Sequence, residues 1–329
     1  MSYKGRMEKR TKKRKKRFII IFPLLLILLS GLVYGSYLTY KAMAAADQAR
    51  VELERGGKSD LREEVVDPGK NNISVLFLGI DDSESRGFGE NARTDAIMLA
   101  TFNLKEKSVK MVSIPRDSYV YQPDRDVYDK INHAHAFDGI DGTVNTVEDL
   151  FGLPVDYYVR MNFKAFIEVV EALNGIKVNV PVSFSEMDSK DNAGAIRLEK
   201  GLQELDGEEA LALARTRKLD SDIERGKRQQ LIVKGIIDKA ASISSVTKYD
   251  NVIDALGKNL STNMTFSQMM SLHKYATSGD MDVESIEIEG YDSYIDNTYY
   301  YELDEASLEE KASILRQHLN LETQAEQAE

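Results

Sequence analysis

Hydrophobic and polar positions along this chain follow two different periods. Short apolar runs predict buried strands at 73–78, 96–102, 109–114, 155–161, 176–180 and 283–288. Apolar residues with a helical period predict helices at 143–151, 162–173, 208–214, 223–240, 249–259, 266–276 and 304–319. The tyrosine-rich segment 291–301 predicts a hairpin or an edge loop. Because strands alternate with helices, we expect an α/β domain with a central sheet over residues 71–320.

The N-terminal region predicts a membrane anchor. Residues 18–40 form a stretch of 23 residues without a charge, and a helix of that length spans roughly 35 Å, enough to cross a bilayer. Residues 1–17 carry a net charge of +9 within a chain of −11, so the positive-inside rule predicts a cytoplasmic tail and an extracytoplasmic domain. A cleaved signal peptide shares this order of basic and apolar residues, but the apolar stretch is longer than a signal core, which favours an uncleaved single-pass anchor.

The flanking regions fit this topology. Residues 41–70 predict an extracytoplasmic stalk that Gly56 and Gly57 interrupt, and the Glu/Gln-rich residues 321–329 predict a frayed tail. A basic run beside an apolar helix is typical of a topology signal at anionic lipid head groups, so no nucleic-acid partner is expected. The absence of cysteine fits a bacterial protein outside the cytoplasm.

Residues 215–230 concentrate positive charge within an acidic domain. Arg215 and Arg217 are two residues apart, so an extended segment would point both to one side. Asp222, Arg225 and Gln229 would share one face of a helix. Arginines near a helix start suit an oligo-anion such as a pyrophosphate, because guanidinium groups pair bidentately with phosphate. A solvated charged helix with internal ion pairs is the alternative reading of this segment.

Charged residues also follow the predicted strands. Asp81 follows the first strand, Asp95 precedes the second, and Arg116 follows the third. Since ligands collect at the carboxyl ends of strands, Asp81 and Arg116 should converge if their strands are parallel neighbours, with Asp95 reaching the same edge from a loop. Lys130 adds a further cation after a Tyr/Asp-rich loop. Each aspartate alone is more often a turn or capping residue, but together with residues 215–230 they favour a metal–pyrophosphate site.

Other chemistries lack their motifs. The chain has no Walker A sequence, no G-x-S-x-G and no H-E-x-x-H, and residues 87–92 fit G-x-G-x-x-A without a direct strand-to-helix turn. His133 and His135 alternate in an expected loop, but they have no cysteine or third ligand nearby in the sequence, which disfavours a zinc site.

The order of the motifs resembles one family. The motifs are VLFLGID at 75–81, RTD at 93–95, SIPRD at 113–117, KIN at 130–132, LDGEEALALARTR at 205–217 and D-x-x-R-x-x-RQQ at 222–230. In this order they resemble the LytR-CpsA-Psr family of membrane-anchored cell-wall glycopolymer transferases. The link between residues 217 and 222 is shorter than in many relatives, which alters the rim of the site but removes no motif residue.

The resemblance implies a central mixed β-sheet sandwiched between helix layers, and a hydrophobic pocket for a polyprenyl chain. It implies transfer of a glycopolymer such as teichoic acid from an undecaprenyl-pyrophosphate carrier to a peptidoglycan sugar hydroxyl, with Mg²⁺ or Mn²⁺. Asp81 and Asp95 would be the metal-side residues, and either would serve as general base. The pyrophosphate would be bound by Arg93, Arg116, Lys130, Arg215, Arg217, Arg225 and Gln229, with Arg116 and Arg217 catalytic. The alternatives are a polyprenyl-pyrophosphate hydrolase that uses water as acceptor, and a non-enzymatic membrane-anchored regulator.

Overall fold

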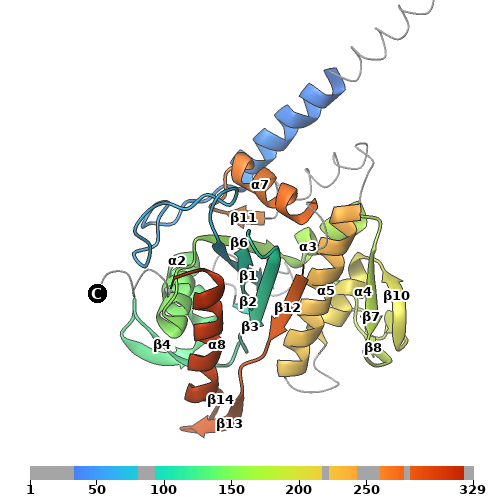
Figure 1. Ribbon diagram of the computed structural model, residues 1–329. Helices are drawn as coiled ribbons and strands as arrows, with labels where there is room; N and C mark the ends of the chain where they lie inside the picture. The colour runs from blue at the N-terminus through green and yellow to red at the C-terminus, as the bar shows by residue number, and fades with distance from the viewer. Residues whose placement is uncertain (1–32, 81–92, 217–221, 243–259, 278–281, 322–329) are drawn as a thin grey trace, which may run out of the picture. The chain divides into compact units, whose positions relative to one another are not determined.

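The computed structural model describes residues 33–80, 93–216, 222–242, 260–277 and 282–321 (Figure 1). Its strands are β1 Ile73–Ile80, β2 Thr94–Asn103, β3 Ser108–Ser113, β4 Tyr119–Gln122, β5 Val127–Lys130, β6 Tyr157–Asn162, β7 Ile176–Val180, β8 Phe184–Glu186, β9 Ile196–Leu198, β10 Gly201–Leu205, β11 Leu260–Thr262, β12 Asp282–Ile286, β13 Gly290–Ile295 and β14 Thr298–Leu303. Its helices are α2 Ile131–Phe151, α3 Phe163–Ala172, α4 Gly207–Arg215, α5 Asp222–Ser242, α7 Phe266–Thr277 and α8 Glu305–His318. Residues 33–49 are also helical, and the helix expected at 249–259 lies outside the described residues.

The fold centres on a mixed sheet in the order β11-β6-β1-β2-β3-β12. β1 runs parallel to β6, and β3 runs parallel to β12, while β2 is antiparallel to both β1 and β3. The mixed sheet within an α/β fold agrees with the expected architecture. Because β2 lies between β1 and β3, these two strands are not neighbours, contrary to the premise drawn from the sequence, but they still run in the same direction.

Alternating side chains bury both faces of the sheet. On β2, Ile97 and Leu99 pack in a cluster with residues of α2 and α8, whereas Met98 and Ala100 pack on the opposite face, where Val233 of α5 contacts them. The period of two along a strand produces this division. Figure 1 shows α2 and α8 on one side of the sheet and α5 on the other, so the sheet lies between helices.

Helix α2 begins earlier than the sequence predicts. It starts at Ile131, so His133 and His135 lie in a helix and the loop expected for them is wrong. Gly139 interrupts the helical backbone with φ 65° and ψ −145°, a conformation that glycine adopts without a Cβ clash. The buried positions at the start of α2 include the polar residues Asn132 and His135 beside Ile131 and Ala134, so the sequence shows no continuous apolar stripe here.

The segment expected as a stalk packs on the domain for most of its length. Residues from Ala45 onward belong to one compact unit that extends to the C-terminus, and residues 1–44 form a separate unit. Arg55 contacts Glu148, and Arg62 forms two hydrogen bonds with Asp156 at 2.7 and 2.9 Å. The compact unit therefore begins about 25 residues before the expected boundary at residue 71. The segment is held on the domain because its arginines form ion pairs with buried carboxylates.

Most of the expected anchor, residues 18–40, lies outside the described residues, and only residues 33–40 are seen, as helix. Within the ranges that the structure describes, none of the helices has both the length and the apolar composition needed to cross a membrane.

Candidate functional site

One edge of the sheet brings together residues that are far apart in the sequence. β1 and β3 end at this edge, and the antiparallel β2 begins there. Asp95 is the second residue of β2, and Arg116 follows β3 by three residues, so Arg116 Nη1 donates to Asp95 Oδ1 at 2.6 Å. Asp95 thus reaches the edge from a strand, whereas the sequence predicted a loop. The strand order explains why these side chains meet.

A row of alternating charges continues from this pair. Arg116 Nε lies 3.4 Å from Asp117 Oδ2, and Lys130 Nζ donates to Asp117 Oδ1 at 2.9 Å. We call Asp95, Arg116, Asp117 and Lys130 the ion-pair chain. Their side chains are between 12% and 26% exposed, so each charge is shielded but still open to a ligand. Sequence reasoning included Asp117 in the SIPRD motif but gave it no role, although it stands beside Arg116.

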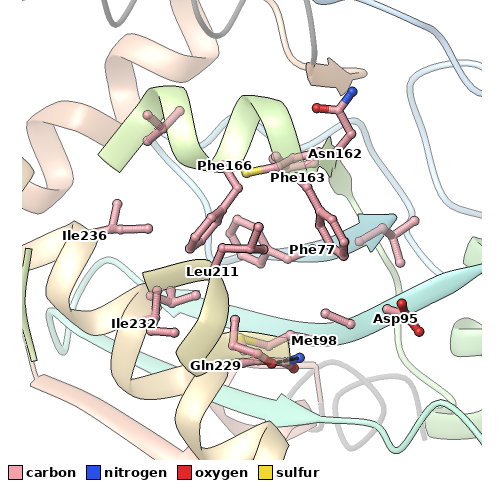
Figure 2. A pocket seen from close by; sticks show the side chains of 18 of the residues that line it. Phe77, Asp95, Met98, Asn162, Phe163, Phe166, Leu211, Gln229, Ile232 and Ile236 are labelled. Carbon is pink, nitrogen blue, oxygen red and sulfur yellow. Dashed lines mark hydrogen bonds between the residues drawn. The ribbon is translucent and has the colours of Figure 1, made fainter. Parts of the chain in front are cut away.

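A cavity of about 430 Å³ opens beside Asp95. Its apolar lining comes from β1, β2, β6, α3, α4, α5 and α7, and includes Phe77, Met98, Phe102, Val159, Met161, Phe163, Phe166, Val169, Leu211, Ile232, Val233, Ile236, Ile237 and Leu272. In Figure 2, Phe77, Phe163 and Phe166 gather in the middle of the cavity, with Asp95 at one end and Ile236 at the other. The cavity combines a long apolar interior with a charged end, which suits an amphiphile with an anionic head group.

Helix α5 carries polar groups of this charged end. Arg225 and Gln229 are one helical turn apart and both line the cavity, as their spacing predicted. The helix approaches β3 closely at Gly226, where an added Cβ would lie 2.6 Å from Ser113 Oγ. Arg228 is buried and donates to the carbonyl of Thr216 at 2.8 Å. Gly226 and Arg228 therefore fix the helix that positions the two cavity residues.

Arg215 lines the cavity at the end of α4 and also has a structural contact. Its Nη2 donates to the backbone carbonyls of Met187 and Asp188. Helix α4 begins with a capping box, in which Asp206 accepts from Glu209 N and Glu209 accepts from Asp206 N. The capping box fixes the start of α4, and the two carbonyls hold the Arg215 side chain at its end.

The remaining predicted residues are distributed differently. Arg93 is exposed immediately before β2. Asp81 and Arg217 lie outside the described residues. Gln229 lines the cavity and donates to the carbonyl of Ala214 at 3.2 Å. The structure brings six predicted residues to the cavity or to the ion-pair chain, namely Asp95, Arg116, Lys130, Arg215, Arg225 and Gln229.

Neither the apolar lining of the cavity nor Asn162 was assigned from the sequence. Asn162 caps α3 by accepting from Ala165 N at 2.8 Å and also lines the cavity. Two phenylalanines three residues apart, Phe163 and Phe166, were the available signal, but a core helix shows the same spacing. Within the described part of the chain, no group of three or more His, Cys, Asp or Glu residues is arranged to hold a metal ion.

Comparisons with known proteins agree with this geometry. The LytR_cpsA_psr family model matches residues 36–317. The chain is 44% identical over 322 residues to polyisoprenyl-teichoic acid–peptidoglycan teichoic acid transferase TagT of Bacillus subtilis strain 168, covering 96% of this chain and 99% of the relative. It is 38% identical to the transferase TagV of the same strain, over 93% of this chain and 79% of that relative.

Solved structures that resemble this chain come from the same family. A structure described as TagT bound to LIIa-WTA has a TM-score of 0.71 and 44% identity, and covers 82% of this chain and 99% of that one. A second structure, the LytR-CPS2A-psr family protein YwtF (TagT) with bound octaprenyl pyrophosphate lipid, has a TM-score of 0.66 and 41% identity over 82% of this chain and 99% of that one. The chain belongs to the LytR-CpsA-Psr family.

Proposed function

We propose that this LytR-CpsA-Psr protein is a phosphotransferase that moves a glycopolymer, such as teichoic acid, from a polyprenyl-pyrophosphate carrier to a sugar hydroxyl of peptidoglycan. The observation that carries the proposal is the cavity of about 430 Å³, which joins an apolar interior to an end lined by Asp95, Arg215 and Arg225. The polyprenyl chain fits the apolar part, and the pyrophosphate fits the arginines. The relatives named above as teichoic acid transferases support the same reaction.

The reaction exchanges the phosphoanhydride bond of the carrier's pyrophosphate for a phosphoester bond to the acceptor sugar. The acceptor hydroxyl oxygen attacks the phosphorus next to the sugar, and a new P–O bond forms. The bond from that phosphorus to the bridging oxygen breaks, and the oxygen leaves with polyprenyl phosphate. The hydroxyl proton passes to the carboxylate of Asp95 or Asp81. Seven polar side chains bind the pyrophosphate, namely Arg93, Arg116, Lys130, Arg215, Arg217, Arg225 and Gln229. The cations among them stabilise the negative charge that develops as the bond to the bridging oxygen breaks.

A divalent cation fits the donor set that we infer. Mg²⁺ in phosphoryl-transfer sites takes one or two carboxylates and completes its coordination with phosphate oxygens and water. Asp95 is a cavity-lining carboxylate with a 26% exposed side chain, and Asp81 would be the second protein ligand. When bound, Mg²⁺ or Mn²⁺ would neutralise part of the pyrophosphate charge.

We also infer the cellular location from the sequence. Residues 18–40 would anchor the chain in the membrane as a single span, with residues 1–17 in the cytoplasm and the domain outside. This topology would place the cavity on the side of the membrane where peptidoglycan is found.

A reconstituted transfer assay tests the function. The full chain in detergent is given a polyprenyl-pyrophosphate-linked glycopolymer with a labelled sugar, together with soluble peptidoglycan glycan strands. We expect label on the glycan strands and release of polyprenyl phosphate. Free labelled glycopolymer phosphate without transfer would identify a hydrolase instead. No turnover of the donor, with binding intact, would favour the non-enzymatic regulator.

A further inference from the structure

The hairpin formed by β4 and β5 presents aromatic rings on its outer face. Val120 and Gln122 are 3% and 1% exposed, so one face of the hairpin is buried. Side chains alternate along a strand, which places Tyr119 and Tyr121 on the opposite face. Tyr121 is directly paired with Tyr128 of β5, whose side chain is 61% exposed. Tyr119 and Tyr121 are half-buried, so this ordered hairpin offers one exposed and two partly exposed aromatic rings on one face, which indicates a binding surface.

The rings form a continuous row with one further tyrosine from β14. The ring centroids of Tyr121 and Tyr128 are 5.3 Å apart, those of Tyr128 and Tyr119 are 5.5 Å apart, and those of Tyr119 and Tyr300 are 4.9 Å apart. We call these four residues the tyrosine face. β14 is fixed beside β4 because Tyr301 N donates to the carbonyl of Asp117 at 2.9 Å. The rings are therefore held in place before any ligand binds.

The tyrosine face adjoins the proposed site of reaction. Lys130 is directly paired with Tyr119 in the hairpin, and its Nζ lies 5.5 Å from the ring centroid of Tyr300. The same Nζ donates to Asp117 in the ion-pair chain at 2.9 Å. Lys130 thus links the aromatic row to the residues that lead to Asp95 and the cavity. A polymer lying on the rings would have one end near the charged end of the cavity.

The charge around the rings argues against a polyphosphate ligand. The hairpins β4–β5 and β13–β14 carry six carboxylates against two cations, namely Asp124, Asp126, Asp129, Asp292, Asp296 and Glu302 against Arg125 and Lys130. Tyr121 Oη donates to Asp126 Oδ1 at 2.7 Å, so one of these carboxylates directly borders the ring row. Negative groups repel a chain of phosphates and accept hydrogen bonds from hydroxyl groups. This surface suits a sugar polymer whose backbone carries no phosphate.

We propose that the tyrosine face binds the acceptor, a glycan strand of peptidoglycan, and delivers its sugar hydroxyl to the ion-pair chain. The proposal rests on the proposed function and names the surface used by one of its two substrates. The C–H faces of pyranose rings are apolar and stack on aromatic side chains, while the sugar hydroxyls find carboxylate acceptors at the rim. Tyrosine provides this combination of an apolar body and a polar tip with little side-chain entropy to lose.

A binding experiment without donor tests the proposal separately from turnover. The full chain in detergent is titrated with soluble, uncrosslinked peptidoglycan glycan strands by calorimetry. We expect Tyr121→Ala/Tyr128→Ala to bind them roughly tenfold more weakly, because two stacking surfaces are lost. The matched control is Tyr294→Ala, a 72% exposed tyrosine of β13 outside the tyrosine face, which should bind as the parent chain does. If the double variant does not fold, the single variant Tyr128→Ala is titrated in its place.

A second titration with poly(glycerol phosphate) identifies which substrate uses the surface. We expect no binding of this polyanion at concentrations where the glycan strands saturate. Unchanged glycan binding in the tyrosine variants, or tyrosine-dependent binding of poly(glycerol phosphate), would overturn the assignment. Since neither titration needs turnover, loss of transfer by the parent chain would contradict the proposed function while leaving this binding result intact.

Discussion

Replacement of Arg116 with alanine is the sharpest test of the ion-pair chain. Arg116 is the cation between two carboxylates, with Nη1 2.6 Å from Asp95 and Nε 3.4 Å from Asp117. Its side chain is 21% exposed, so solvent screens these pairs only in part. Loss of one preorganised charge that stabilises a transition state lowers kcat by about 10²–10³. Loss of a partly exposed ion pair destabilises the fold by only about 1 kcal/mol.

We therefore expect Arg116→Ala to lose about 10²–10³ in kcat while its thermal midpoint changes by only a few degrees. Arg116→Lys should retain part of the activity, because lysine keeps the charge but not the bidentate fork. The matched control is Lys110→Met on β3, the strand that precedes Arg116, which removes an ion pair with Glu284 and should transfer normally. Both kcat and the midpoint are measured on each purified variant. If Arg116→Ala kept more than a tenth of the parental kcat, the role assigned to the ion-pair chain would be refuted.

Three further predictions concern the cavity and the fold. Phe166→Asn should raise KM for a long-chain donor at least tenfold, because a polar group enters the apolar lining, whereas Leu202→Asn at a 75% exposed site should not. Arg62→Ala should lower the free energy of unfolding by about 3–5 kcal/mol in urea, since it leaves Asp156 buried without its cation, and a loss below 1 kcal/mol would contradict this. Burial lowers the pKa of His318 from 6.5 to about 4, so the neutral ring is favoured in the fold. Stability from His318 should be present above pH 6.5 and fall as the pH drops toward 4, by at most about 3 kcal/mol, and His318→Gln should lack this component.

Elements with strong local signals were predictable from the sequence. The apolar run at β1 and the helical period of α5 are strong enough to specify a strand and a helix. The end of α3 was also predictable, because Asn174 and Gly175 adopt φ 58° and φ 77°, the left-handed region that these residues tolerate best. In each case one segment contains the physical cause of its own structure.

Elements that depend on distant partners were not predictable. The sequence predicts a loop where the structure has β4 and β5, because these strands have only four residues each and their turn carries charges. Its position depends on a bridge between Ser118 and Tyr301, which are far apart in the sequence. Likewise, the meeting of Asp95 and Arg116 depends on β2 lying between β1 and β3, and no local pattern encodes strand order. The residue types indicated the chemistry, whereas their arrangement required the tertiary structure.

Helix α5 has a consequence for how the protein would select its lipid. Arg225 and Gln229 at the charged end and Ile236 and Ile237 in the apolar interior belong to one continuous helix. Arg225 and Ile237 are twelve residues apart, so a fixed rise separates them by roughly 18 Å along the axis. The helix therefore sets the distance between the residues that would bind the head group and those that would contact the hydrocarbon chain. A single inserted residue after Gln229 would rotate the apolar positions by roughly 100° relative to the polar ones. The helix could then no longer present both sets of side chains to the same lipid, so recognition of the head group and recognition of the hydrocarbon chain depend on each other.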